Sequence, residues 1–261
     1  MNDRLLNQAC LKELNLTGGE RILDVGSGLG QFTRLMAQAA GPAGRVLGIE
    51  RDPGQISGAR ELIAGSALES NIAFRNGDAM DLPLEAGEWG SFDLAHSRFV
   101  LEHVPEPGKV VAHMAKAVRP GGRVVLADDD HAQFTPYPAP PGFHTIWDAY
   151  CRSYDRIGCD AFVGRRLTTF LVVAGLKPRR NTLVFFGGCA GDEVFEIAAL
   201  NIIKILEGTR ELMLEHRLIS SENYEAGIAG LHRWMTLPDA ALWYGMNWVE
   251  PKRVKYKKFT R

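Results

Sequence analysis

Short runs with β-strand character alternate with helical windows over the first half of the chain. The runs are 21–25, 45–50, 71–76, 92–97 and 122–128. The windows between them, such as GQFTRLMAQAA and PGQISGARELIAGSA, repeat apolar residues at helical spacing. Repeated strand–helix–strand units predict right-handed crossovers and a parallel sheet with helices on both faces. The alternation therefore predicts a doubly wound α/β fold.

This rhythm is interrupted after residue 130. A proline-rich segment, 131–143, is not expected to form the interior of a regular element. Later segments predict helices at 144–158, 164–177, 192–216 and 221–236, and strands at 179–188 and 240–250. We interpret residues 1–261 as one domain, with a core at about 18–130 and cap insertions at about 131–160 and 190–236.

Composition excludes several classes of protein. The 261 residues are 46% hydrophobic and carry a formal net charge of -1, so no basic field attracts nucleic acid or an anionic membrane. The basic tail at 252–261 is expected to be a solvated terminus. Four cysteines without a C-x-x-C pair, no signal-peptide pattern and no membrane-length apolar run predict a reduced, cytoplasmic protein without membrane insertion.

A glycine-rich loop follows the first predicted strand, in the stretch RILDVGSGLGQF at 21–32. Such a loop brings backbone N–H groups to the crevice at the carboxyl end of the sheet. A dinucleotide fingerprint requires a glycine where this chain has Gln31. The strand also ends in Asp24, whose carboxylate would repel a pyrophosphate but suits a cationic amine.

Acidic residues also follow the next two strands. Glu50 closes the second strand, in place to accept both hydroxyls of a ribose, and Asp78 follows the third, in place to accept an adenine amino proton. Acids after three strands, with no phosphate-binding lysine, describe a ligand with an amine, a ribose and an adenine but no phosphate. S-adenosylmethionine has these groups.

At these positions the chain resembles the class I S-adenosylmethionine-dependent methyltransferases, and is most similar to the small-molecule branch that includes the ubiquinone and menaquinone biosynthesis enzymes. The segments ILDVGSGLG, VLGIERD, NGDAMDLP, FDLAHSRFVLEHVPEP and RPGGRVVLAD carry the resemblance. It implies a Rossmann-like, doubly wound, seven-stranded sheet whose last strand is antiparallel and lies between the fifth and sixth, with helical cap insertions.

The resemblance also implies how the cofactor would be held. Glu50 would bind the ribose hydroxyls, Arg51 would flank the adenine, and Asp78 and Ala79 would contact the adenine edge. The residues implied for the methionine moiety are Asp24, Gly26, Ser27, Gly28, Gly30, Gln31 and Ser97. The expected product is S-adenosylhomocysteine.

Methyl transfer by direct in-line displacement needs an aligned acceptor, and a general base only where the acceptor carries a proton. His131, directly after LADDD, is the candidate for that base or for acceptor binding. Arg98 is a candidate for an acceptor carboxylate, although a pairing with Glu102 is the more ordinary use. Trp147, Tyr150 and Tyr154 are candidate acceptor contacts in an aromatic lid, with ordinary core packing as the alternative.

No metal is predicted, because the three consecutive acids at 128–130 cannot converge on one ion from a strand end. The functional alternatives are a non-catalytic S-adenosylmethionine-binding protein and a nucleic-acid methyltransferase. Amino-group methylation of bases needs an N/D-P-P-Y/F/W loop where this chain has SRFV, and a nicotinamide dehydrogenase conflicts with Gln31 and Asp24. The expected partner is a small-molecule acceptor, and the protein is expected to be a monomer or a homodimer.

Overall fold

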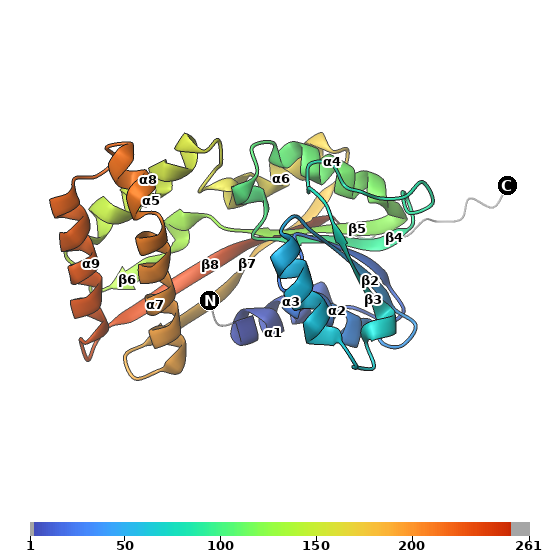
Figure 1. Cartoon of the computed structure of the whole chain (residues 1–261), viewed down its shortest axis with the longest axis horizontal. Coiled ribbons are helices and arrows are strands. Elements are labelled where there is room, and N and C mark those ends of the chain that lie inside the picture. The colour runs from blue at the N-terminus through green and yellow to red at the C-terminus, as the bar shows by residue number, and fades with distance from the viewer. Residues whose placement is uncertain (1–2, 252–261) are drawn as a thin grey trace.

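The computed structural model describes residues 3–251, so the basic tail at 252–261 lies outside the described residues. Its described part is built on one mixed sheet of eight strands, in the order β3-β2-β1-β4-β5-β8-β6, with β7 also paired to β8 (Figure 1). The strands are β1 (Arg21–Val25), β2 (Arg45–Glu50), β3 (Ile72–Asn76), β4 (Phe92–Arg98), β5 (Val118–Asp128), β6 (Thr135–Tyr137), β7 (Pro178–Cys189) and β8 (Ala241–Pro251).

Strands β1 to β5 run parallel and bring their carboxyl ends to one edge. The register places Asp24 beside His96 and Val25 beside Ser97. Alternate residues of β1 face opposite sides, so Ile22 belongs to one hydrophobic core and Leu23 to the other. The doubly wound fold predicted from the sequence is confirmed.

Strand β8 has partners along both of its edges. It pairs antiparallel with β7 over its whole length, from Ala241 to Pro251. Its other edge is divided between β6, opposite 241–243, and β5, opposite 247–249. The last strand is therefore antiparallel and lies between β5 and β7, as the resemblance implied.

The sheet has one more strand than the seven that were expected. Strand β6 lies inside the proline-rich segment that was predicted to be irregular. Pro136 pairs opposite Leu242 at the edge of the sheet, where a residue without an N–H group is tolerated. The additional strand is only three residues long, and it connects the core to the cap.

Helices cover both faces of the sheet and one end of it (Figure 1). Side chains of α1 to α3 join the first hydrophobic core, and side chains of α4 and α6 join the second. Helices α5, α7, α8 and α9 form the cap around the far ends of β6, β7 and β8. The bounds are α1 (Asp3–Leu14), α2 (Gln31–Ala40), α3 (Pro53–Ile63), α4 (Pro107–Ala117), α5 (Phe143–Arg156), α6 (Leu167–Val173), α7 (Glu193–Gly208), α8 (Arg210–Glu215) and α9 (Ser221–Met235).

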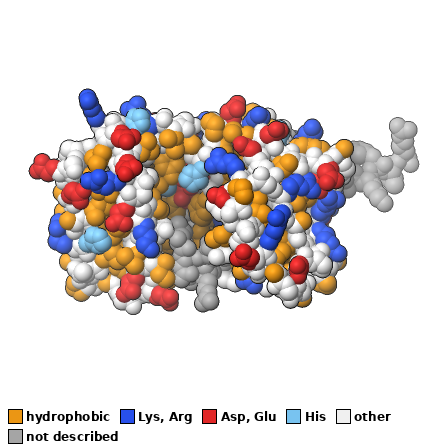
Figure 2. Space-filling view, in the orientation of Figure 1, with side chains coloured by type: hydrophobic (Ala, Val, Ile, Leu, Met, Phe, Trp, Pro, Cys, Tyr) orange, Lys and Arg blue, Asp and Glu red, His pale blue; other side chains and the backbone are white. Residues whose placement is uncertain are grey.

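The cap and the α1–α3 face of the sheet share one continuous core. Phe195 of α7, Trp234 of α9 and Trp248 of β8 belong to the same buried cluster as Met36 of α2. Among residues 3–251, no helix is long and apolar enough to cross a membrane. On the face shown in Figure 2, acidic and basic side chains are intermixed and form no patch of one sign.

Candidate active site

A cleft opens at the carboxyl ends of β1, β2 and β4. It consists of two neighbouring cavities of about 270 and 230 Å³, both lined by Gly26, Gly28, Gln55 and Phe99. The larger cavity extends over the ends of β2 and β3, and the smaller one over β1, β4 and the start of α2. The cleft is thus at the place where doubly wound folds bind ligands.

The glycine loop forms the floor between the two cavities. Gly26 has a φ of +75° and donates its N–H to the carbonyl of Ile49 at 2.8 Å, and a Cβ there would overlap Val100. Gly30, with a φ of +73°, lines neither cavity, since its α-carbon packs against Phe74 and Ala59. The loop therefore needs one glycine for the cleft and another for close packing beneath it.

Glu50 is held in the larger cavity by three backbone donors. Its Oε2 accepts from the N–H of Gly28 at 2.9 Å, and its Oε1 accepts from the N–H groups of Arg51 and Asp52 at 2.8 and 3.0 Å. These bonds fix the carboxylate without using all of its lone pairs. Asp78 and Ala79 line the same cavity.

Asp24 is buried at the base of the smaller cavity. Its Oδ2 accepts from the hydroxyl of Thr33 at 2.6 Å, and its Oδ1 lies 2.9 Å from Nδ1 of His96. Because an ionised carboxylate only accepts, Nδ1 is the donor and Nε2 of His96 carries a lone pair. That Nε2 is buried and has no hydrogen-bond partner in the described chain.

Arg98 lies on the same side of the cleft, not beside the second cavity described below. Its guanidinium lies 4.3 Å from the centre of the Phe32 ring, and its buried Nη1 has no partner within residues 3–251. The expected pairing with Glu102 was wrong. Arg98 ends β4 and Phe99 has a φ of +57°, so no α-helix connects Arg98 to Glu102 and the four-residue spacing does not bring the two side chains together.

Most of the predicted cofactor residues line the two cavities. Ser97 is an exception, because it is fully buried inside β4. Gly30 is the other. Those that do line a cavity are Asp24, Gly26, Ser27, Gly28, Gln31, Glu50, Arg51, Asp78 and Ala79.

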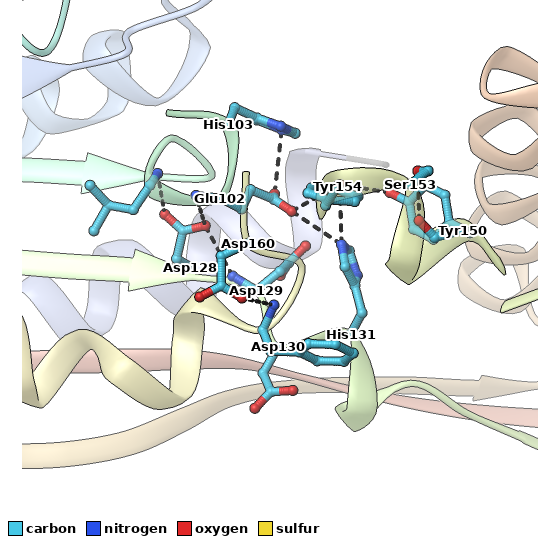
Figure 3. Close-up of polar contacts among 12 residues, drawn as sticks. Glu102, His103, Asp128, Asp129, Asp130, His131, Tyr150, Ser153, Tyr154 and Asp160 are labelled. Atoms are coloured by element: carbon cyan, nitrogen blue, oxygen red, sulfur yellow. Dashed lines mark hydrogen bonds and ion pairs between the residues drawn. The ribbon is translucent and has the colours of Figure 1, made fainter. Parts of the chain in front are cut away.

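A buried hydrogen-bond network lies behind the loop that follows β4 (Figure 3). Oε2 of Glu102 lies 3.1 Å from Nε2 of His131 and accepts from the hydroxyl of Tyr154, also at 3.1 Å. The Tyr154 hydroxyl is 2.8 Å from that of Tyr150. His103, the neighbour of Glu102, stacks on the Tyr154 ring and lines the larger cavity of the cleft.

The three consecutive acids after β5 point to different partners. Asp128 accepts from the N–H groups of Val100 and Leu101 at 3.1 and 2.8 Å. Asp130 forms a two-bond ion pair with Arg165 at 2.6 and 2.7 Å. Asp129 turns towards Tyr244, although its Oδ1 and the tyrosine hydroxyl do not form a well-aligned hydrogen bond.

One ligand atom each from Glu102, Asp129 and His131 lies within 4.8 Å of the others. Nε2 of His131 and Oε2 of Glu102 are already within hydrogen-bond distance of each other and of the Tyr154 hydroxyl. The arrangement is therefore that of a hydrogen-bond network, and the expectation of no metal stays a prediction.

The network concentrates negative charge in the interior. Burial, with the nearby charge of Glu102, raises the pKa of Asp128 to about 8 and that of Asp129 well above its ordinary value. Burial also opposes ionisation of Glu102, but the hydrogen bond from His131, the neighbouring imidazoles and the hydrogen bond from Tyr154 outweigh it and lower the pKa of Glu102. Glu102 is thus the ionised member of the group.

A second, internal cavity of about 30 Å³ lies under the cap, and His131 is one of its lining residues. Its lining residues come from the cap and from the ends of β5, β7 and β8: Asp129, His131, Phe134, Trp147, Phe186, Ala198, Asn201, Ile202, Ile205 and Tyr244. Of the predicted acceptor contacts, Trp147 lines this cavity. Tyr150 and Tyr154 instead contact the His131 ring.

Sequence reasoning missed several residues of both sites. Glu102 was expected to pair with Arg98, Asp129 was considered only as a metal ligand within the acidic run at 128–130, and neither His96 nor Tyr244 was among the predicted site residues. Only the parallel register of β1 and β4, which pairs Asp24 with His96, could have indicated one of them in advance. The contact of Glu102 with His131 joins loops 29 residues apart and has no local sequence signal.

Comparisons with known proteins were made for the whole chain. A family model described as "Methyltransferase domain" matches residues 16–171. A 37.1 kDa protein in transposon TN4556 of Streptomyces fradiae is 33% identical over 197 residues, 73% of this chain and 54% of that protein. Demethylmenaquinone methyltransferase of Lactobacillus johnsonii is 29% identical over 143 residues, 55% of each chain. The chain thus spans about half the length of these relatives.

Solved structures share the fold at low sequence identity. A SAM-dependent methyltransferase from Aquifex aeolicus has a TM-score of 0.53 at 18% identity, covering 70% of this chain and 87% of that one. The [4+2]-cyclase SpnF has a TM-score of 0.57 at 19% identity, covering 95% and 81%. At these identities the likeness shows the fold alone.

Proposed function

Since the chain belongs to the class I S-adenosylmethionine-dependent methyltransferases, we propose that it transfers the methyl group of this cofactor to a small-molecule acceptor by direct in-line displacement. One observation carries the proposal. Carboxylates at the ends of β1 and β2, Asp24 and Glu50, and Asp78 after β3 line a cleft whose lining contains no lysine. That pattern suits an amine, a ribose and an adenine but no phosphate.

The described residues fit this cofactor at both ends of the cleft. Glu50 would accept the ribose hydroxyls and Asp78 the adenine amino group. At the methionine end, the unpartnered Nε2 of His96 and the carboxylate of Asp24 would hold the ammonium group. Ser97 is proposed to contribute only backbone groups, and Gly30 only packing.

Arg98 is proposed to bind the carboxylate of the cofactor, not a carboxylate of the acceptor. It lines the smaller cavity with Gln31, at the start of α2, whose N-cap Gly30 makes no side-chain hydrogen bond. Helix α2 is 10 residues long, and its first N–H groups together with a guanidinium form a favourable site for a carboxylate. Arg98 and Asp24 would then hold opposite charges of one amino-acid moiety.

The cofactor supplies an activated methyl group, and the protein has to align the acceptor behind it. Alignment alone contributes about 7–11 kcal/mol towards the barrier. The positive charge of the sulfonium disperses during transfer, so an apolar acceptor cavity favours the reaction. The internal cavity, lined by Trp147, Phe134 and Ile202, is the proposed acceptor site, with His131 at its edge.

The class of acceptor, the cell compartment and the domain organisation are also proposed. The intermixed surface charges and the SRFV loop favour a small acceptor over nucleic acid, and the four free cysteines favour a reducing cytoplasm. The whole chain is proposed to act as one domain, with its core at about 18–130 and caps at about 131–160 and 190–236. Both a monomer and a homodimer are compatible with this proposal.

Calorimetry with the purified protein tests the cofactor assignment. We expect S-adenosylmethionine and S-adenosylhomocysteine to bind at micromolar strength and NAD not to bind. NAD binding without binding of either sulfur ligand would overturn the proposal. Detection of S-adenosylhomocysteine by mass spectrometry, in reactions with an acceptor panel, then separates an enzyme from a non-catalytic binder.

A further inference from the structure

The tautomer of His131 is set by its partners. Nε2 lies 3.1 Å from Oε2 of Glu102 and 3.2 Å from the Tyr154 hydroxyl. The Tyr154 proton is donated to Glu102, so this tyrosine oxygen is left to accept from Tyr150. Because Glu102 is a pure acceptor, Nε2 carries the proton and Nδ1 carries the lone pair.

The lone pair of Nδ1 has no partner in the part of the chain that the structure describes. The His131 side chain is only 6% exposed, and its ring packs edge-on against Trp147 and Tyr150 at 5.5 and 5.2 Å. A buried acceptor without a partner is costly, and such groups in folded proteins generally have a reason, such as a ligand. His131 lines the internal cavity, so a ligand there could supply the missing donor.

Two further polar atoms face the same cavity without well-formed hydrogen bonds among residues 3–251. They are Oδ1 of Asp129 and the hydroxyl of Tyr244. Apart from Asn201, the remaining lining is aromatic and aliphatic, and includes Phe134, Phe186 and Ile202. A hydroxyl compound with an apolar body complements this set, because its oxygen can accept from Tyr244 while its proton is donated to His131.

We propose that the acceptor is a hydroxyl compound with an apolar body of the size of an aromatic ring, an inference that rests on the proposed function. Nδ1 of His131 is then the general base for the O-methylation of this compound. In the step, the hydroxyl oxygen forms a bond to the methyl carbon. The carbon–sulfur bond breaks, and its electron pair remains on sulfur. The hydroxyl proton moves to Nδ1, and the imidazolium later releases it to water.

Glu102 acts through His131 as a positioning residue. It fixes the Nε2–H tautomer and stabilises the imidazolium that forms during transfer. The groups that face His131 are Glu102 from the loop after β4, Asp129 beside it, Tyr150 and Tyr154 from α5, and Tyr244 from β8. Burial raises the pKa of Asp129 and of the three tyrosines, so it disfavours a negative charge on each of these four groups.

A cationic amine is the less suitable occupant. It would need an ionised carboxylate in the cavity, whereas burial and the charge of Glu102 raise the pKa of Asp129 and so disfavour its ionised form. It would also have to lose a proton before it could attack the methyl group. The cavity volume of about 30 Å³ is below that of an aromatic ring, so α5 or α7 has to move for the acceptor to enter.

The tautomer can be measured without knowing the acceptor. Long-range ¹H–¹⁵N NMR of the histidine rings in the whole protein, at neutral pH, should show His131 neutral, with Nε2 protonated and Nδ1 bare. Glu102→Gln should move this signal, whereas Glu61→Gln, an exposed site on α3, should not. A protonated Nδ1 in the native protein would overturn the proposal even if S-adenosylmethionine binds normally.

A matched set of probes tests the acceptor class: 1-naphthol, 1-naphthylamine and naphthalene-1-thiol, each with S-adenosylmethionine. We expect 1-methoxynaphthalene as the main product, with a kcat that rises with pH to a plateau. His131→Gln should lower this kcat by about 10²–10⁴-fold, remove the pH inflection and leave cofactor affinity unchanged. Glu102→Gln should lower kcat less, at similar KM, with Glu102→Asp restoring part of the loss.

His144→Gln, at an exposed site in the first turn of α5, is the control histidine and should behave as the native protein. Methylation of only the amine or the thiol would overturn the hydroxyl assignment, as would an unchanged pH profile in the His131 variant. Loss of the naphthol activity on treatment with a chelator would show that a metal, not His131, activates the oxygen. Failure to bind S-adenosylmethionine would instead refute the proposed function.

Discussion

At the scale of single residues, the cleft uses side chains that organise the loop and face the ligand at once. Glu50 accepts the N–H of Gly28 from the glycine loop while its carboxylate lines the nucleoside cavity. Asp24 is likewise held by Thr33 and His96 before any ligand arrives. These groups are therefore preorganised, and a substitution at one of them affects both the ligand and the loop.

Replacing Glu50 by alanine should weaken S-adenosylmethionine binding by about 10- to 100-fold. Hydrogen bonds to a charged group are worth about 1.5–3 kcal/mol, and the ribose would lose its acceptor. The melting temperature should fall modestly, because the N–H of Gly28 also loses its partner. Calorimetry and thermal unfolding measure the two effects. Glu61→Ala, on the exposed side of α3, is the control, and native affinity in the Glu50 variant would refute the ribose assignment.

Replacing Arg98 by lysine should raise the KM for the cofactor roughly tenfold and leave the KM for the acceptor unchanged. Lysine keeps the charge but loses the planar fork that can hold a carboxylate with two bonds and stack on Phe32. Steady-state kinetics with each substrate varied in turn provides the measurement. Arg156→Lys, at an exposed position, is the control. A change confined to the acceptor KM would restore the assignment first made from the sequence.

At the scale of elements, helix α5 links the cap to the polar network. Its aromatic residues Trp147, Tyr150 and Tyr154 are buried, and the Trp147 Nε1–H donates to the carbonyl of His131 at 2.9 Å. The stripe is therefore part of the cap core and also surrounds the candidate base. The three aromatic residues lie on one face of α5, so the two alternatives left open by the sequence, lid and core, do not exclude each other.

Trp147→Phe and Trp147→Ala should differ in their effect. The alanine variant should lose about 3–5 kcal/mol of unfolding free energy, because it leaves a cavity in the cap. The phenylalanine variant should lose about 1–3 kcal/mol, because the His131 carbonyl loses its donor. Both should reduce acceptor turnover at near-native cofactor affinity. A loss of cofactor binding in the phenylalanine variant would show that the cap and the cleft are not separable.

The sequence predicted best where parallel strands end. Asp24, Glu50 and Asp78 were expected together because the carboxyl ends of adjacent parallel strands share one edge, and all three line the cleft. The break between α7 and α8 was not expected within the long helical window. There the Thr209 hydroxyl bonds to the carbonyls of Ile205 and Leu206, a local competition with the helix that apolar spacing does not reveal.

The Glu102–His131 contact could not be predicted for a different reason. Each residue follows a different strand, and their meeting depends on η2 (Leu101–His103) and η3 (His131–Gln133) turning towards each other. Three backbone amides after β4 converge on Asp128, which fixes the first of these turns. Such a turn is set by one tertiary contact and leaves no periodic pattern in the chain.

At the scale of the whole molecule, buried acids tie stability to pH. Asp128 is protonated up to about pH 8 in the folded protein but ionises near its ordinary pKa when unfolded. Between these values the folded state binds more protons, so the unfolding free energy decreases as pH rises, by at most about 1.4 kcal/mol per unit for one group. The raised pKa of Asp129 also makes the unfolding free energy decrease as pH rises.

We therefore expect the unfolding free energy to fall between about pH 5 and pH 8, and Asp128→Asn to flatten this slope. The amide oxygen can still accept from Val100 and Leu101, so the loop should keep its conformation. Urea unfolding at several pH values measures the slope. Asp148→Asn, at an exposed site on α5, should leave it unchanged, and an equal slope in the Asp128 variant would contradict the assignment.

Strand β8 has a consequence for the order in which the molecule can be made. It is the last strand of the described chain to leave a ribosome, yet it lies inside the sheet between β5 and β7. Until it emerges, β5 keeps an open edge, and the cap helices lack Tyr244 and Trp248, which complete their core. Until then the nascent chain has an incomplete sheet, whose exposed apolar surface and open edge are accessible to chaperones and proteases. A message truncated before Ala241 would yield neither a stable core nor a cap.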